Sequence, residues 1–164
     1  MKVKRQLLQQ TVSKVAFLPL LVDGSTKLTG VIIDRNTLPE SLSMILAMAT
    51  AAATGTPTAF SYSILVEHGN DSGLSDAANL YTAQTFTNAS PTTPKEYKIE
   101  CDLLLAKRYV RVSITPTFTA GTTPKCNTAI IAVFGDGNIV APSATATVQL
   151  NGTGYPDTDT VLKV

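Results

Sequence analysis

Apolar and polar residues alternate at every second position along much of this chain, as they do in β-strands with one dry and one wet face. In the clearest example Val110, Val112 and Ile114 alternate with more polar neighbours. The stretch 128–134 that follows is apolar at both sets of positions, and it therefore predicts a strand buried on both faces. A Gly/Pro/Thr turn lies between the two strands and favours a hairpin.

The same alternation predicts strands in five further segments: 27–33, 60–66, 82–87, 97–105 and 143–150. Residues 41–53 have a helical composition, but the turn at 54–57 and the alternating strand after it favour a strand and a hairpin. Residues 3–16 are consistent with a short amphipathic helix or an extended arm, and 158–164 with a last strand or a tail. The chain therefore consists mainly of strands separated by turns.

Eight or nine short strands with turn signals between them are typical of a β-sandwich or barrel. At 164 residues the chain suits one domain. We expect an all-β fold, a jelly-roll-like β-sandwich of mostly antiparallel strands with extended N- and C-terminal segments. The expected organisation is an N-terminal arm over 1–25, the sandwich over 26–150, and a C-terminal strand or tail over 151–164.

Composition narrows the possible partners. Charged residues make up 15% of the chain and threonine accounts for 24 residues, which predicts neutral strand faces because threonine is β-branched and tolerates water. A net charge of +1 argues against nucleic-acid binding, which requires several phosphates to be neutralised. No apolar run reaches the length of a membrane span. Polar residues after the basic start do not resemble a signal peptide, so we expect synthesis in a cytosol.

Candidate catalytic and metal-binding residues are few. His68 could form a Ser-His-Asp set with Ser72 and Asp76, but no G-x-S-x-G motif occurs, and an exposed loop histidine is the simpler interpretation. The oxygen-rich residues 70–76 lack EF-hand spacing, and acidic residues in turns usually cap backbone N–H groups. The sequence predicts no enzyme activity, no metal and no cofactor.

Cys101 and Cys126 match no zinc or redox motif. Cys101 shares a predicted dry face with Tyr97 and Ile99, which favours a buried free thiol. A disulfide between the two cysteines stays open as an alternative, since it requires only that their strands be neighbours.

Two blocks of the sequence resemble a known family. The first is FSYSILVEHGNDSGLSDAANL at 60–80, and the second is KRYVRVSITPTFTAGTTPKCNTAIIAVFG at 107–135. In this order they are similar to the small head decoration, or cement, proteins of tailed bacteriophages. The resemblance covers roughly residues 27–136. It implies a jelly-roll subunit on the outer capsid surface of the virion, without enzymatic activity.

The resemblance also implies partners, namely the major capsid protein and the chain itself as a homodimer or homotrimer. The residues that we expect to make such contacts are charged or terminal: Lys2, Lys4, Arg5, Arg108, Arg111, Tyr155 and Val164. Two alternatives stay open. One is a carbohydrate-binding or adhesin-type sandwich, although tryptophan is absent, and the other is a small jelly-roll capsid subunit whose basic start faces the genome.

Overall fold

The computed structural model describes residues 11–38 and 41–135, together with the backbone of 161–163. One sheet contains β1 (Val12–Asp23), β4 (Ser43–Thr50), β8 (Lys95–Asp102), β10 (Lys125–Gly135) and β11 (Val161–Lys163). The other contains β2 (Leu28–Thr29), β3 (Ile33–Asp34), β5 (Ala59–Gly69), β6 (Ala78–Asn79), β7 (Gln84–Asn88) and β9 (Tyr109–Thr119). A 3-10 turn, η2 (Arg35–Thr37), follows β3.

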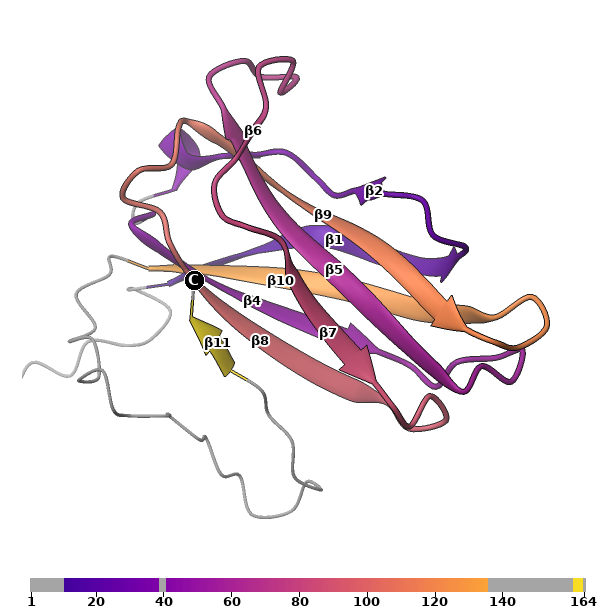
Figure 1. The fold of residues 1–164 in the computed structure, drawn as a ribbon. Coiled ribbons are helices and arrows are strands. Elements are labelled where there is room, and N and C mark those ends of the chain that lie inside the picture. Colours follow the sequence, from indigo (N-terminus) through magenta and orange to yellow (C-terminus); the bar gives the residue numbers. More distant parts are fainter. Residues whose placement is uncertain (1–10, 39–40, 136–160, 164) are drawn as a thin grey trace, which may run out of the picture.

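The two sheets form the two layers of a sandwich (Figure 1). The first sheet has the strand order β1-β10-β4-β8-β11, and the second has β2-β9-β5-β6, with β3 paired to β9 and β7 paired to β5. Pairing is antiparallel throughout the described residues except between β11 and β8. The prediction of an all-β, mostly antiparallel sandwich is confirmed. No helix in the described part of the chain has the length and hydropathy needed to cross a bilayer.

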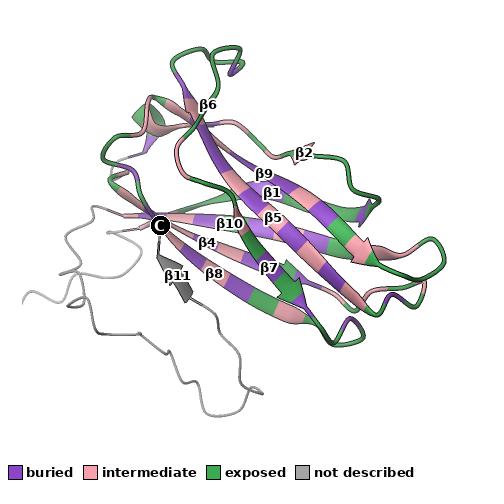
Figure 2. Cartoon of the chain, in the orientation of Figure 1, coloured by how far each residue is buried: buried purple, intermediate pink, exposed green. Residues whose placement is uncertain are grey.

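The core is built from the inward positions of the alternating strands, which show as regular bands along β5, β9 and β10 in Figure 2. Phe60, Tyr62 and Phe134 are among its largest fully buried side chains. The predicted apolar face of 97–105 is buried as far as Leu103, but Leu105 is 84% exposed. The strand ends at Asp102, so its alternation no longer governs the loop that follows.

Both predicted hairpins are wrong, although the strands themselves exist. β4 and β5 belong to different sheets, and so do β9 and β10. Their connections arch from one layer to the other and meet at one end of the sandwich, where the Thr122 N–H donates to the Gly55 carbonyl at 2.8 Å. Gly55 and Gly121 both have positive φ, and a Cβ on Gly121 would lie 2.6 Å from the Gly55 oxygen. Alternation shows which face of a strand is buried, but it does not show in which sheet the next strand lies.

The expected N-terminal arm differs from the structure over residues 12–23, which form β1 beside β10. Ala16, Phe17 and Val22 of this strand are buried in the core. The predicted strand at 27–33 is reduced to the short β2 and β3, because Val31 turns away from β9 and its N–H donates to the Ala16 carbonyl of β1. Residues 1–10 and the predicted strand at 143–150 lie outside the described residues.

The prediction for 128–134 is correct for only one of its two faces. In β10, Ile130, Ala132 and Phe134 are buried inward. Ile131, which points to the opposite face, is 48% exposed. A strand whose composition suits burial on both faces is therefore covered by this chain's described residues on the inner face only.

One hydrogen bond crosses the core between the two sheets. The Tyr62 hydroxyl of β5 and the Thr128 hydroxyl of β10 lie 2.6 Å apart, and both residues are buried. A buried polar group without a partner is costly. This pair therefore fixes how the two sheets sit against each other as well as satisfying both hydroxyls.

We expect Tyr62→Phe to lower the free energy of unfolding by about 1–2 kcal/mol, because it leaves the Thr128 hydroxyl buried without its partner. Urea unfolding measures the effect. The double variant Tyr62→Phe with Thr128→Val should cost less than the sum of the two single changes. Additive costs would show that the two hydroxyls do not interact.

Candidate functional site

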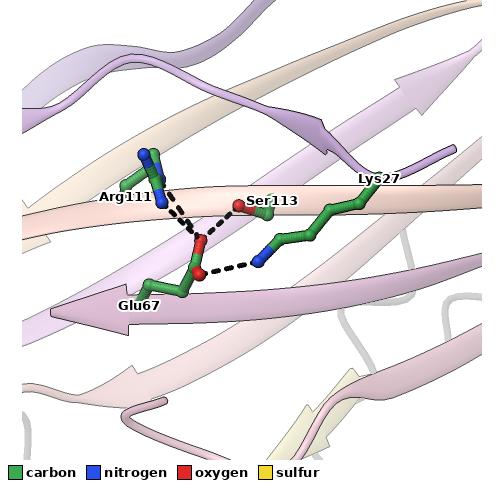
Figure 3. Close-up of polar contacts among 4 residues, drawn as sticks. All are labelled: Lys27, Glu67, Arg111 and Ser113. Carbon is green, nitrogen blue, oxygen red and sulfur yellow. Dashed lines mark hydrogen bonds and ion pairs between the residues drawn. The ribbon is translucent and has the colours of Figure 1, made fainter. Parts of the chain in front are cut away.

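A cluster of charged side chains lies on the outer face of the second sheet, around Glu67 of β5 (Figure 3). Arg111 of β9 stands directly opposite Glu67 in the ladder. Lys27, which precedes β2, donates to one carboxylate oxygen at 2.7 Å, and Arg111 Nε donates to the other at 3.2 Å. The Ser113 hydroxyl donates to that second oxygen as well. Glu67 thereby joins three segments of the sheet.

The electrostatics of this cluster keep Glu67 ionised. Burial alone would raise the pKa of its carboxyl group, but the hydrogen bonds from Lys27 and Ser113 and the positive charges of Arg111 and Lys27 lower it below the usual value. An ionised carboxylate that already accepts from three donors has no proton to give at neutral pH. The cluster is therefore suited to holding the sheet together.

The predicted contact residues fall into two groups. Arg108 forms a two-pronged pair with Asp34, with Nε–Oδ1 at 3.0 Å and Nη2–Oδ2 at 2.7 Å, and its guanidinium lies 4.9 Å from the centre of the Tyr109 ring. Arg111 belongs to the Glu67 cluster. Both arginines thus bind within the chain, while their contacts with a partner stay predictions. The remaining predicted contacts lie outside the described side chains: Lys2, Lys4, Arg5, Tyr155 and Val164.

The loop between β5 and β6 uses its acidic residues to cap its own backbone. Asp76 accepts from the backbone N–H groups of Asn70 and Asp71, and Asp71 accepts from those of Gly73 and Ser75. These bonds lower the pKa of both carboxyl groups. Among the described residues no group of three or more His, Cys, Asp or Glu side chains is placed to hold a metal ion.

His68 supports the neighbouring loop at the same end of the sandwich. Its Nδ1 accepts the backbone N–H of Lys107 at 3.2 Å. Burial lowers the pKa of His68, the positive charges of Lys107 and Arg35 lower it further, and Asp76 opposes them. The imidazole is therefore neutral at pH 7 with its proton on Nε2.

Both cysteines are free and buried, which confirms the buried free thiol predicted for Cys101. Burial raises the pKa of the Cys101 thiol to about 12, so this thiol stays protonated and unreactive at neutral pH. The Cys126 thiol donates to the Ala51 carbonyl at 3.2 Å. Both thiols therefore belong to the packed interior.

The surface feature that the sequence analysis missed is a set of exposed, large apolar side chains on and beside β1. Four of them belong to β1 itself, and two lie next to it: Val15, Leu18, Leu20, Leu21, Val31 and Ile131. Their exposed fractions run from 41% for Val31 to 62% for Leu18. Exposed large apolar side chains gathered on one strand and its neighbours mark an interaction site more often than scattered single residues do. We take this set as the candidate functional site.

The known proteins that resemble this chain do so distantly. No family model and no curated protein matches the chain. The VP2 protein of an infectious bursal disease virus subviral particle aligns with 79% of this chain and 33% of its own, at 7% identity and a TM-score of 0.45. The PBSX exported protein XepA aligns with 93% of this chain and 47% of its own, at 14% identity and a TM-score of 0.40.

Tobacco streak virus coat protein aligns with 90% of this chain and 100% of its own, at 10% identity and a TM-score of 0.27. The chain thus spans about a third of the VP2 chain and about half of XepA. These likenesses are distant.

Arg111→Ala should leave the domain folded and lower its free energy of unfolding by roughly 1 kcal/mol, because Glu67 keeps Lys27 and Ser113 as donors. Arg108→Ala removes the more exposed ion pair with Asp34, and it should lower the free energy of unfolding by less than Arg111→Ala does. Urea unfolding of both variants gives the comparison. Loss of the fold in Arg111→Ala would contradict its placement on the outer face of the sheet.

The stability of the protein should fall as the pH drops from 7.5 to 5. The pKa of His68 is lower in the folded state than in the unfolded chain, so the unfolded state binds the proton more readily in this range. The contribution is fully present above the unfolded pKa of about 6.5 and is lost as the pH falls through the folded value. In His68→Gln, urea midpoints at pH 7.5 and 5.5 should differ less than in the wild type. An unchanged difference would exclude His68 as the cause.

Proposed function

We propose that this chain is a structural decoration, or cement, protein of a tailed-phage head, which binds the outer capsid surface and stabilises contacts between major capsid proteins. It acts through shape and surface contact, without catalysis. The observation that carries the proposal is the set of large apolar side chains that a rigid sandwich exposes on and beside β1.

The sequence resemblance supports this function through residues that form the middle of the sandwich. The first block, 60–80, covers most of β5 together with β6, and the second, 107–135, covers β9 and β10. β5 and β9 pair along their whole length, from Ala59 opposite Thr119 to Gly69 opposite Tyr109. The two blocks therefore meet in one continuous ladder of the second sheet, formed by β5 and β9, while β10 of the second block lies in the first sheet.

The surface available for contact lies at the edge of the first sheet. Leu18, Leu20 and Val31, which we call the edge patch, are 62%, 47% and 41% exposed. β1 is the terminal strand of its sheet, and the Val31 N–H donates to the Ala16 carbonyl at 2.8 Å, so this loop covers part of that edge. Natural edge strands usually carry charges that discourage association. A leucine-rich edge instead favours contact with another protein.

The arrangement suits binding to a capsid lattice. A head presents many equivalent sites, and an oligomer that touches several of them gains from effective concentration even when each contact is modest. The polar groups described above are engaged within the chain. We therefore expect the described surface to bind a partner mainly through apolar contacts.

The geometry does not favour the carbohydrate-binding alternative, which needs exposed aromatic platforms. Tyr62 and Tyr97 lie in the core. The Tyr81 hydroxyl donates to the Asp102 carbonyl, and Tyr109 lies against Arg108. No sheet face among the described residues presents two exposed tyrosines.

Purified protein should co-sediment with undecorated heads of the phage that encodes it and saturate at a fixed number of copies per head. Leu18→Glu should weaken this binding at least tenfold, because it places a charge in the edge patch. Leu105→Glu is the matched control: the same change at a leucine that is 84% exposed elsewhere should leave binding unchanged.

The absence of binding under assembly conditions would contradict the proposed function. Equal weakening by both glutamate variants would show that the edge patch has no special role. Recovery of the protein inside the shell, against nucleic acid, would favour the alternative of a small capsid subunit.

A further inference from the structure

The outer face of the first sheet is apolar where β4 and β10 lie side by side. An antiparallel sheet with one face in water normally carries polar residues on that face. The second sheet follows this rule, because its outward positions on β5, β7 and β9 carry hydroxyl side chains: Ser61, Ser63, Thr85, Thr87, Thr115 and Thr117. The first sheet departs from it in three ladder rows, which pair Ile45 with Val133, Ala47 with Ile131, and Ala49 with Ala129.

We call the apolar surface formed by these three rows the β4–β10 face. At its centre Ile131 is 48% exposed, and Val15, its ladder neighbour on β1, is 46% exposed. On the β8 side the apolar surface ends at charged residues, namely Glu96, Lys98 and Glu100. Among the described residues the face therefore has the composition of a buried layer but lies open.

The strand order shows that the chain must pass from one side of this sheet to the other. β10 ends at Gly135, and the chain enters the same sheet again at Val161, where β11 lies beside β8 (Figure 1). β10 is antiparallel to β4, β4 is antiparallel to β8, and β11 is parallel to β8. β10 and β11 therefore run in the same direction, with β4 and β8 between them. Strands related in this way are joined by a crossover connection, because a hairpin can join only antiparallel strands.

The ladder register gives the path that this connection has to cover. Gly135 is level with Asp102 of β8, since both pair with Ser43, whereas Val161 is level with Lys98. The chain must thus return along the strands by about 13 Å and move sideways across three strand spacings, about 14 Å. The inner side of the sheet is filled by the core, where Tyr62 meets Thr128. The outer side, which includes the β4–β10 face, is the side left for a crossover.

The sequence of the connecting residues 136–160 matches that surface. No charged residue occurs between Gly137 and Pro156. Within this stretch residues 143–150 alternate without interruption, with alanine, valine and leucine at the even positions and serine, threonine and glutamine at the odd ones. In an extended conformation such a segment has one apolar side and one polar side, and its eight residues reach about 26 Å. It therefore has the length and the alternation needed to cover an apolar sheet and face water on its other side.

We propose that residues 143–150 lie extended across the β4–β10 face, with their apolar side chains against Ile131 and their threonines toward water. The inference concerns the chain alone and does not depend on the proposed function. Removal of both apolar surfaces from water favours this arrangement, and the alanines in both layers allow the segment to approach the sheet closely. The edge patch lies on β1 and the loop beside it, off the β4–β10 face, and stays available to a partner.

Thiol labelling of the purified full-length chain tests whether the face is covered. The variant Ile131→Cys places a thiol at the centre of the face, and Leu105→Cys places one at a leucine that is 84% exposed elsewhere. We expect a maleimide to modify Ile131→Cys at least about tenfold more slowly than Leu105→Cys, because thiol reactivity depends on access. The native Cys101 and Cys126 are both buried, so their resistance to the reagent shows that each variant is folded.

A second pair of variants tests whether residues 143–150 provide the cover. Val148→Glu, added to Ile131→Cys, puts a charge on the apolar side of the segment and should raise the labelling rate to nearly that of Leu105→Cys. Thr147→Glu is the matched control, because it puts the same charge on the polar side of the neighbouring position and should leave Ile131→Cys protected. If Val148→Glu exposes the two native thiols, the milder Val148→Ser gives the same comparison in a folded chain.

Three results would overturn the proposal. Rapid labelling of Ile131→Cys in the otherwise unchanged chain would show that the face is open and that the connection runs around the β8 edge. Protection that neither Val148→Glu nor Val148→Ser relieves would show that another part of the chain covers the face. Protection that is lost on dilution, together with a dimer in light scattering, would show that a second copy covers it.

Discussion

Packing of the inner faces of the two sheets is the interaction on which the other features of this molecule depend. The alternating strands give each sheet one apolar side, and the free energy of removing those sides from water holds the layers together. The hydrogen bond between Tyr62 and Thr128 crosses this layer and adds a fixed geometry to a non-directional force. Every exposed feature is positioned relative to that layer.

Because the strand period is two, filling the core also determines what reaches the outside. On the second sheet the outward positions carry hydroxyl side chains and the Glu67 cluster, in which the Glu67 carboxylate pairs with Lys27 and Arg111. On the first sheet the outward positions of β4 and β10 carry mainly valine, isoleucine and alanine, whereas those of β8 are charged. The same constraint therefore produced a polar outer surface on the second sheet and a partly apolar outer surface on the first.

This asymmetry fits a protein that works by contact. The packed sandwich makes the domain rigid. The exposed apolar side chains on and beside β1 offer a surface for contact with another protein. The polar residues that could have pointed to catalysis form hydrogen bonds within the chain. Asp71 and Asp76 cap the backbone of their own loop, His68 accepts from Lys107, and the two thiols are buried. The proposed binding to a capsid lattice requires a stable shape and a surface for contact, and the described residues form a packed sandwich with exposed apolar side chains on β1.

Local pattern was sufficient to predict the fold class, the strands around Val110 and Tyr97, and the buried thiol of Cys101, because each follows from which side of a strand is apolar. Pattern could not predict that β4 and β5, or β9 and β10, lie in different sheets, since a turn within a sheet and an arch between sheets leave the same alternation. It also could not pair Glu67 with Arg111, residues far apart in sequence that only the ladder brings together. The composition of 128–134 by itself determined that both faces of this strand favour burial. Only the tertiary structure decided that the described chain covers one of them, because a two-layer sandwich has a single inner layer to offer.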